Sequence, residues 1–293
     1  MGSALTTIGL PVALGIIMLG LGLSLTLGDF ARIAKHPKAV VIALVCQLVL
    51  LPAVCFGLVL AFQLPPVLAV GMMLLAASPG GTTANLYSHL FRGDIALNIS
   101  LTAINSIIAV FTLPIIVNLS IAYFEPGEGQ VGIQFAKALE VFAIVLLPVA
   151  VGMLIRWWKP AFAARMDKPV RIASVIILAV VIAGAVISNL TILLENLGAL
   201  AGITVLFCVL SLTIGFLVPR LFRVSREQAV ASSFEIGIHN ATLAIVIAQT
   251  VLGNIEMSLP AAVYGVLMFF VAAAFGFLIR GRGAKKVDAA ASV

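Results

Sequence analysis

The sequence consists largely of long apolar runs that follow one another with only short polar connections between them. A helix of about 20 apolar residues is long enough to cross the hydrocarbon core of a bilayer. We therefore predict an all-α, polytopic membrane protein in which residues 1–293 form a single transmembrane domain of nine helices. The predicted helices are residues 4–27, 38–62, 67–92, 94–123, 131–158, 169–190, 196–222, 226–251 and 258–280.

The composition excludes most soluble classes of protein. Hydrophobic residues make up 62% of the chain and charged residues 10%, whereas soluble domains have about 25% charged residues. The net charge of +6 does not indicate a nucleic-acid partner, because Lys and Arg mark the cytoplasmic side of a membrane protein. The expected surroundings are the lipid bilayer, and no obligate protein partner is evident.

The basic residues predict the orientation of the chain. Nine helices place alternate loops on opposite sides, and every Lys and Arg except Lys137 falls on the side of the C-terminus. The positive-inside rule then puts the N-terminus outside and the C-terminus in the cytoplasm of a multi-pass protein of the cell (inner) membrane. The residues on the cytoplasmic side are Arg32, Lys35, Lys38, Arg92, Arg156, Lys159, Arg165, Lys168, Arg171, Arg220, Arg223, Arg226, Arg280, Arg282, Lys285 and Lys286.

Two predicted helices, the third and the eighth, contain polar and helix-breaking residues. The third contains the stretch SPGGTTAN at 78–85, and the eighth contains Glu235, Gly237, His239 and Asn240. Pro and Gly weaken a helix, and unwound backbone at membrane depth requires protein or water to satisfy it. A simple kink is the structural alternative, but we predict two broken helices.

The broken helices occupy matching places in the chain. An offset of five pairs helices 1–4 with helices 6–9 and leaves the fifth helix unpaired. Because five is an odd number, the two halves are inverted relative to each other in the membrane. Inverted repeats with a broken helix in each half are typical of secondary transporters, with the ion and substrate sites at the breaks.

Glu235 is an acidic residue predicted to lie near the middle of the bilayer. It follows Arg226 by nine residues, which is about 13 Å along a helix, and no Lys or Arg lies within one turn of it. Ionisable groups at this depth are costly and usually functional. A protonated carboxyl that bonds two helices together is one explanation, and a carboxylate that binds a cation is the one we favour.

Other polar side chains at membrane depth offer oxygen. Asn98, Thr102 and Asn105 lie on one face of the fourth helix, and Gln47 precedes Pro52 by five residues. Such residues also hold membrane helices together. Oxygen ligands suit an alkali cation, and no Cys or His cluster suggests a transition metal. Glu235 and His239 have no second acidic or Cys partner nearby, so we expect no catalytic residues and no enzyme.

At these residues the sequence resembles the bile acid:sodium symporter family. The similarity covers nearly the whole chain, and its most specific parts are HPK at 36–38, the spacing from Gln47 to Pro52, the motifs within 78–102, and FEIGIHN at 234–240. The resemblance implies a sodium-coupled symporter that moves an organic anion by alternating access. It also implies a nine-helix, bacterial-type member with core helices at about 38–123 and 196–280 and panel helices at about 4–27 and 131–190.

The resemblance further implies two sodium sites and a substrate site. One sodium site would use Asn85, Asn98, Thr102 and Glu235. The other would use Gln47, Glu235, the carbonyls of Ile236 and Ile238, and His239. The substrate would lie at Gly80, Gly81, Thr82 and Asn240.

The sequence departs from the family at His239, where Gln is usual. A neutral imidazole offers nitrogen, which is a poor sodium ligand, and a charged one would repel the ion. Either one sodium binds, or His239 takes part in proton coupling; a ring that merely bonds a backbone carbonyl is the structural alternative. A proton-coupled transporter or an exporter on the same fold, using Glu235 and His239, therefore stays open. Leu267–Phe270 on the last helix is apolar where bile-acid carriers are often polar, so a small carboxylate is as plausible a substrate as a bile-acid-like molecule.

Overall fold

The computed structural model describes residues 10–26, 28, 36–81, 83–124, 135–188 and 190–280. Within these ranges every regular element is a helix, and the only β-type pairing is an isolated bridge between Gly80 and His239. The all-α class predicted from the apolar runs is therefore confirmed for this part of the chain.

The helices follow the order of the apolar runs. They are α2 (Leu10–Ser24), α4 (Pro37–Val45), η2 (Cys46–Leu50), α5 (Leu51–Phe62), α6 (Pro66–Ala77), α7 (Ala84–Leu90), α8 (Ile95–Phe124), α9 (Phe135–Trp158), α10 (Pro160–Ser188), α11 (Leu190–Leu221), α12 (Arg226–Gly237), α13 (Ala241–Val246), η3 (Ile247–Val251), η4 (Glu256–Ser258) and α14 (Leu259–Ile279).

Four helical stretches of the described chain are long and apolar enough to cross a membrane. They are Pro37–Phe62, Ile95–Phe124, Leu193–Leu221 and Glu256–Ile279. Four further apolar helices are shorter, at Leu14–Ser24, Pro66–Ala77, Leu146–Trp158 and Ala241–Val251. Two of the shorter ones, Pro66–Ala77 and Ala241–Val251, are halves of the interrupted helices.

Two helix starts differ from the sequence prediction. Helix α10 begins at Pro160, not near 169, and α11 begins at Leu190, not near 196. At α10 the prediction was wrong because Arg165, Asp167 and Lys168 lower the local hydropathy, whereas residues 190–195 of α11 are mostly apolar and only Glu195 is charged. Neither stretch contains Gly; Pro160 is at the first position of a helix, where it is tolerated, and Pro169 lies inside α10 without ending it. Helix α10 therefore continues past its apolar part.

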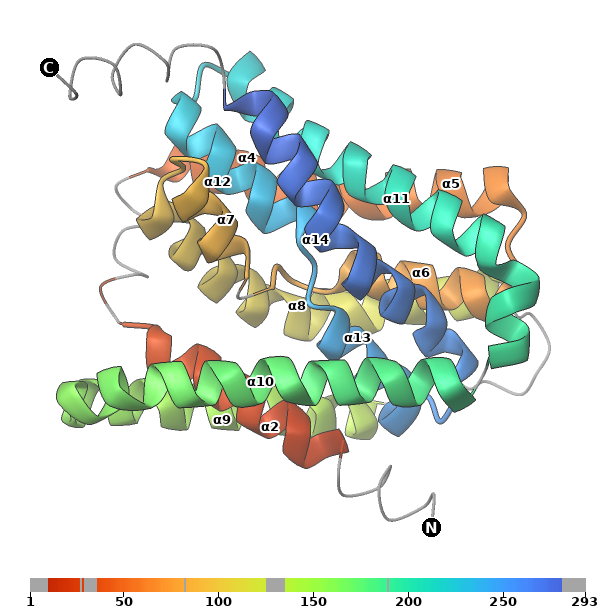
Figure 1. Cartoon of the computed structure of the whole chain (residues 1–293), viewed down its shortest axis with the longest axis horizontal. Coiled ribbons are helices and arrows are strands. Elements are labelled where there is room, and N and C mark those ends of the chain that lie inside the picture. The colour runs from red at the N-terminus through yellow and green to blue at the C-terminus, as the bar shows by residue number, and fades with distance from the viewer. Residues whose placement is uncertain are drawn as a thin grey trace, which may run out of the picture.

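Helices α2, α9 and α10 pack together as a group of their own (Figure 1). Helix α2 lies directly against α9, and a Cβ atom at Gly152 would meet the backbone of α2 at Leu19 and Leu23. Small residues allow this close approach between membrane helices. The group meets the rest of the molecule mainly where α10 passes α14 and where α2 touches α13.

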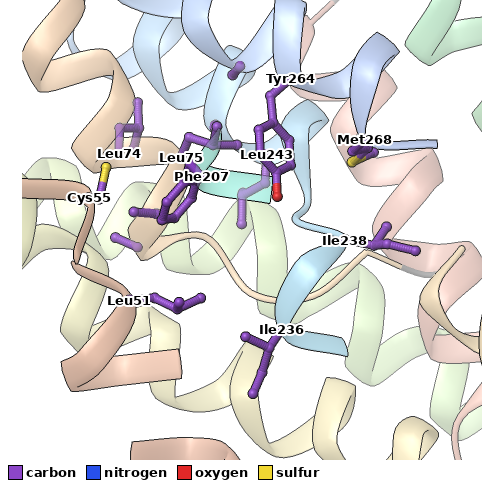
Figure 2. Packing of buried hydrophobic residues seen from close by; sticks show 14 of the residues in the cluster. Leu51, Cys55, Leu74, Leu75, Phe207, Ile236, Ile238, Leu243, Tyr264 and Met268 are labelled. Carbon is purple, nitrogen blue, oxygen red and sulfur yellow. The ribbon is translucent and has the colours of Figure 1, made fainter. Parts of the chain in front are cut away.

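Most of the main hydrophobic core lies among the remaining helices, and it also includes Leu14, Ile17, Met18 and Leu21 of α2 and Val149 of α9. Figure 2 shows Phe207 and Tyr264 beside Leu75 and Leu243 within this core. Phe207 belongs to α11, Tyr264 to α14, Leu75 to α6 and Leu243 to α13. The core therefore ties both interrupted helices to the long helices α11 and α14.

Candidate functional site

The two interrupted helices cross each other at their unwound segments. The first interruption separates α6 from α7, and the second separates α12 from α13. The backbone N–H of Gly81 donates to the carbonyl of Ile238 at 2.6 Å, and that of Asn240 donates to the carbonyl of Pro79 at 2.8 Å. Each segment thus satisfies backbone groups of the other, as buried non-helical backbone requires.

Glu235 lies in the last turn of α12, against this crossing. Its side chain is 2% exposed, and its Oε2 accepts a hydrogen bond from the Thr102 hydroxyl of α8 at 2.5 Å. A Cβ atom at Gly80 would overlap the Glu235 carboxyl. The described groups that interact with the carboxyl belong to Thr102, Asn105 and Gly80, and none of them is basic.

The neighbouring amides are oriented by what their nitrogens bind. The Nδ2 of Asn98 donates to the Ser88 hydroxyl and to the Ala231 carbonyl, both at 2.8 Å. The Nε2 of Gln47 donates to the Ser78 carbonyl at 3.1 Å. Because the nitrogen of each amide is held in this way, its oxygen is directed to the opposite side.

Several buried side-chain oxygens around the crossing accept no hydrogen bond from the described residues. They are Gln47 Oε1, Asn85 Oδ1, Asn98 Oδ1, Asn105 Oδ1 and Glu235 Oε1. A buried oxygen without a donor is costly, and most such atoms in folded proteins have a partner. A hard cation is the partner that this set fits, because carboxylate, amide and hydroxyl oxygens are its preferred ligands.

Gln47 lies in a π-helical turn, the segment η2 between α4 and α5. The N–H of Leu51 donates to the carbonyl of Cys46 rather than to that of Gln47, and Pro52 has no N–H to offer. The carbonyl of Gln47 thereby loses the two donors that an α-turn or a π-turn would supply. Wide turns of this kind are frequent at functional sites, and the Gln47 to Pro52 spacing produces this one.

His239 is fully buried in the second unwound segment. Its Nδ1 lies 3.3 Å from the Ser78 carbonyl, and its ring stacks on Phe207 with centroids 5.4 Å apart and meets the edge of Tyr264. A carbonyl can only accept, so Nδ1 carries the proton and Nε2 of the neutral ring keeps its lone pair. That Nε2 has no hydrogen-bond partner among the described residues.

The residues expected to bind substrate are only partly described. Gly80 and Gly81 lie in the crossing, whereas Thr82 lies outside the described residues. Asn240 caps α13, where its Oδ1 accepts from the N–H of Leu243 at 3.0 Å. The apolar run at 267–270 does not form one surface, because Met268 is 3% exposed and Phe270 is 69% exposed.

Tyr264 is a member of this region that was not predicted from the sequence. Its hydroxyl donates to the carbonyl of Gly237 at 2.8 Å, and the thiol of Cys208 lies 3.6 Å from the same oxygen. Gly237 sits between Ile236 and Ile238, whose carbonyls are expected ion ligands. A single Tyr in an apolar run carries no signal of such a contact, which depends on α14 packing against α12.

The described chain holds no group of His, Cys, Asp and Glu residues that could bind a transition metal. Its cysteines, Cys46, Cys55 and Cys208, are free and buried.

Interrupted helices that cross inside an apolar helical fold define a class, the helical membrane transporters. Comparison with known proteins gives the family: the model of the sodium bile acid symporter family matches residues 11–196, and the chain belongs to this family. The chain is thus a membrane-embedded member of a family of sodium-dependent transporters.

The chain is similar to several named transporters. A protein of Bacillus subtilis named an uncharacterized sodium-dependent transporter, YocS, is 27% identical over 88% of this chain and 78% of its own length. A probable chloroplastic sodium/metabolite cotransporter, BASS2, of Oryza sativa is 26% identical over 93% of this chain and 64% of its own length. The human ileal sodium/bile acid cotransporter is 24% identical over 92% of this chain and 78% of its own length.

Proposed function

We propose that this protein is a symporter that couples the entry of sodium to the uptake of an organic anion. The observation that carries the proposal is Glu235, a buried carboxylate whose Oε1 has no donor and whose described neighbours include no basic group. A sodium ion supplies the positive charge that this carboxylate lacks. The family and the names of the similar proteins support sodium as the coupled ion.

We assign the first sodium site to Asn85, Asn98, Thr102 and Glu235. The orientation of the Asn98 amide supports this assignment, because both hydrogen bonds of its nitrogen direct the oxygen away from Ser88 and Ala231. The Thr102 hydroxyl also holds the Glu235 carboxylate in place at 2.5 Å. Amide, hydroxyl and carboxylate oxygens together match the needs of an alkali cation.

We assign the second sodium site to Gln47, Glu235, the carbonyls of Ile236 and Ile238, and His239. The Oε1 of Gln47, which accepts no hydrogen bond from the described residues, supports this assignment. Two features weaken it relative to the first site: His239 presents a nitrogen, and the carbonyl of Ile238 already accepts the N–H of Gly81. We therefore expect the first site to bind sodium more tightly than the second.

We assign the substrate to the crossing, at Gly80, Gly81, Thr82 and Asn240. The absence of a side chain on Gly80 and Gly81 supports this, because it brings backbone close to Glu235 and to the carbonyls of residues 238 and 239. A substrate bound beside the ion would then be attracted by the charge that sodium brings. The substrate class we propose is an organic anion, either a small carboxylate or a bile-acid-like molecule.

The proposed architecture has nine transmembrane helices in inverted halves, with a panel of α2, α9 and α10 and a core formed by the other helices. The restricted contacts between these groups support alternating access by movement of one against the other. We place the N-terminus outside and the C-terminus in the cytoplasm. Cysteine labelling tests this: Gln63→Cys should react from outside intact cells and Arg223→Cys only from inside.

Proton coupling on the same fold is a second candidate, and the observation that favours it is that His239 Nε2 has no hydrogen-bond partner among the described residues. His239→Gln separates the two. If the ring serves as an impaired sodium ligand, the amide oxygen should strengthen sodium binding in calorimetric titrations and leave sodium-driven uptake intact. If the ring carries a coupled proton, the variant should lose uptake driven by a proton gradient.

The experiment that tests the proposed function is uptake of a panel of carboxylates into proteoliposomes. An inward sodium gradient should drive accumulation of at least one of them, and an equal potassium gradient should not. Accumulation driven by a proton gradient without sodium would favour the second candidate. Exit of preloaded substrate driven by an inward sodium gradient would identify an exporter.

A further inference from the structure

The turn between α9 and α10 has almost no loop. The N–H of Lys159 still donates to the carbonyl of Ile155, and the N–H of Ala163 already donates to the carbonyl of Lys159. We call residues 156–168 the hairpin tip. In Figure 1 this end of α9 and α10 reaches farther than the start of α12 or the end of α14, which lie toward the same side of the molecule.

The length of α10 places the hairpin tip at the surface of the bilayer. Its 29 residues span about 43 Å at 1.5 Å per residue, whereas the hydrocarbon core of a bilayer is about 30 Å thick. The polar residues of α10 are at its Pro160 end, so the excess length falls on the hairpin tip. The first turns of α10 therefore lie at the depth of the lipid headgroups.

The hairpin tip exposes aromatic rings together with positive charge. Trp157 and Trp158 are each 73% exposed and Phe162 is 50% exposed, and the Lys159 ammonium lies 4.9 Å from the centre of the Trp158 ring. Aromatic rings of this kind settle at the interface between lipid and water. Lys159, Arg165 and Lys168 are exposed as well, and Arg156 is partly exposed.

The charge at the hairpin tip is unbalanced. Residues 156–168 contain four basic residues and one acidic residue, Asp167. The hairpin is also held in place, because Ala163 and Val170 of α10 pack with Leu23 of α2 in a small cluster of their own. The positive charges are therefore presented from a braced pair of helices at a fixed depth.

We propose that the hairpin tip is a binding site for the headgroups of anionic phospholipids. A net negative headgroup offers a phosphate to the Lys and Arg side chains without a cation of its own, whereas a zwitterionic headgroup brings a cation that offsets the attraction. The tryptophans and Phe162 fix the depth at which the basic side chains meet the phosphates. The site does not depend on the assignment of the ion or of the substrate.

The sequence supplies its own reporter, because Trp157 and Trp158 are the only two tryptophans of the chain. Their fluorescence can be quenched by lipids with brominated acyl chains, so quenching measures which lipid lies beside the hairpin tip. The test uses the whole protein in phosphatidylcholine vesicles that contain the same small fraction of brominated phosphatidylglycerol or of brominated phosphatidylcholine. The site predicts an apparent enrichment of phosphatidylglycerol of about fivefold, the effect of one basic residue near an anionic surface.

Two matched variants assign the effect to the hairpin tip. The tip variant carries Arg156→Gln, Lys159→Gln, Arg165→Gln and Lys168→Gln. Its tryptophan fluorescence should be quenched equally by the two brominated lipids. The control variant removes the same number of charges from other exposed positions, with Lys38→Gln, Arg92→Gln, Arg223→Gln and Arg280→Gln, and should keep the preference.

Equal quenching of the unaltered protein by the two lipids would overturn the proposal. So would a preference that survives in the tip variant, or one that the control variant loses equally. Should the tip variant not fold, the unaltered protein decides: raising potassium chloride from about 0.05 M to about 0.5 M shortens the screening length and should reduce the preference. A preference that does not change with salt would contradict an electrostatic site.

Discussion

The helix crossing and the α2–α9–α10 group belong to the same apolar helical fold, yet they differ in how their buried polar groups are paired. Every buried side-chain atom of the described residues that lacks a hydrogen-bond partner lies outside α2, α9 and α10. Helix α2 instead meets α9 through close contact between glycines and backbone. One region therefore accepts polar atoms without partners, which points to a ligand, and the other is built for packing.

The difference teaches that burial alone does not locate function in a membrane protein. Both regions are buried against other helices, but among the described side chains only the crossing holds a buried carboxylate and amide oxygens without a hydrogen-bond donor. Free energy is lost wherever a buried oxygen has no donor. A fold that retains four amide oxygens without a donor around a carboxylate whose own Oε1 also lacks one is consistent with a bound ion that repays the loss.

The largest effect is expected from Glu235→Gln. The change removes the negative charge while keeping nearly the same shape, so uptake driven by a sodium gradient should fall to the level of empty vesicles. The measurement is uptake in proteoliposomes. The control is Glu227→Gln, on the exposed first turn of the same helix, which should transport normally. Coupled uptake by the Glu235 variant would show that transport does not need the Glu235 carboxylate.

Gly80→Ala should also abolish coupled uptake. The added methyl group would overlap the Glu235 carboxyl, and overpacking of this kind costs about 1–3 kcal/mol. The matched control is Gly57→Ala, because a Cβ atom there meets nothing within 4 Å. Uptake and melting temperature of the two variants should be measured together, and normal uptake by Gly80→Ala would mean that the carboxyl does not need its place at the crossing.

Gly152→Ala tests the other side of the comparison. Its methyl group would press on the backbone of α2, so the free energy of unfolding should drop by about 1–3 kcal/mol, while the shift in melting temperature caused by sodium should stay the same. Gly198→Ala, where a Cβ atom meets nothing within 4 Å, should show no loss of stability. A lost sodium response in Gly152→Ala would show that the two regions are not independent.

Tyr264→Phe should give a smaller effect, which is limited to the affinity for sodium. The variant removes the hydroxyl that holds the Gly237 carbonyl at 2.8 Å, and a hydrogen bond contributes about 1 kcal/mol, so sodium should bind about fivefold more weakly. Tyr123→Phe is the control, since Tyr123 is 57% exposed. Calorimetric sodium titrations measure the effect, and unchanged affinity in Tyr264→Phe would leave Tyr264 with a packing role alone.

The sequence predicted the helical class and the places where the chain unwinds because both follow from local signals. Apolar runs of spanning length give the helices, and Pro79 with Gly80 and Gly81 gives one of the breaks. The helix start at Pro160 was missed because hydropathy reports on lipid contact rather than on helix formation. A helix that continues into the headgroup region has no hydropathy signal.

The candidate site was predictable only where a residue is out of place in an apolar helix. Glu235, Asn98 and Gln47 stand out for that reason. The contact of Tyr264 with Gly237 depends on how two distant helices pack, and the orientation of the Asn98 amide depends on Ser88 and Ala231. Such relations arise from tertiary structure and leave no local pattern in the sequence.

The most direct test of the central claim is the melting temperature of the purified protein in sodium and in potassium at equal ionic strength. A ligand at a hundred times its dissociation constant stabilises a protein by about 2.7 kcal/mol. Sodium should therefore raise the melting temperature of the unaltered protein by several degrees relative to potassium, and it should have no such effect on Glu235→Gln. Equal melting temperatures in sodium and potassium for the unaltered protein, or the same sodium shift in both proteins, would contradict a sodium site at Glu235.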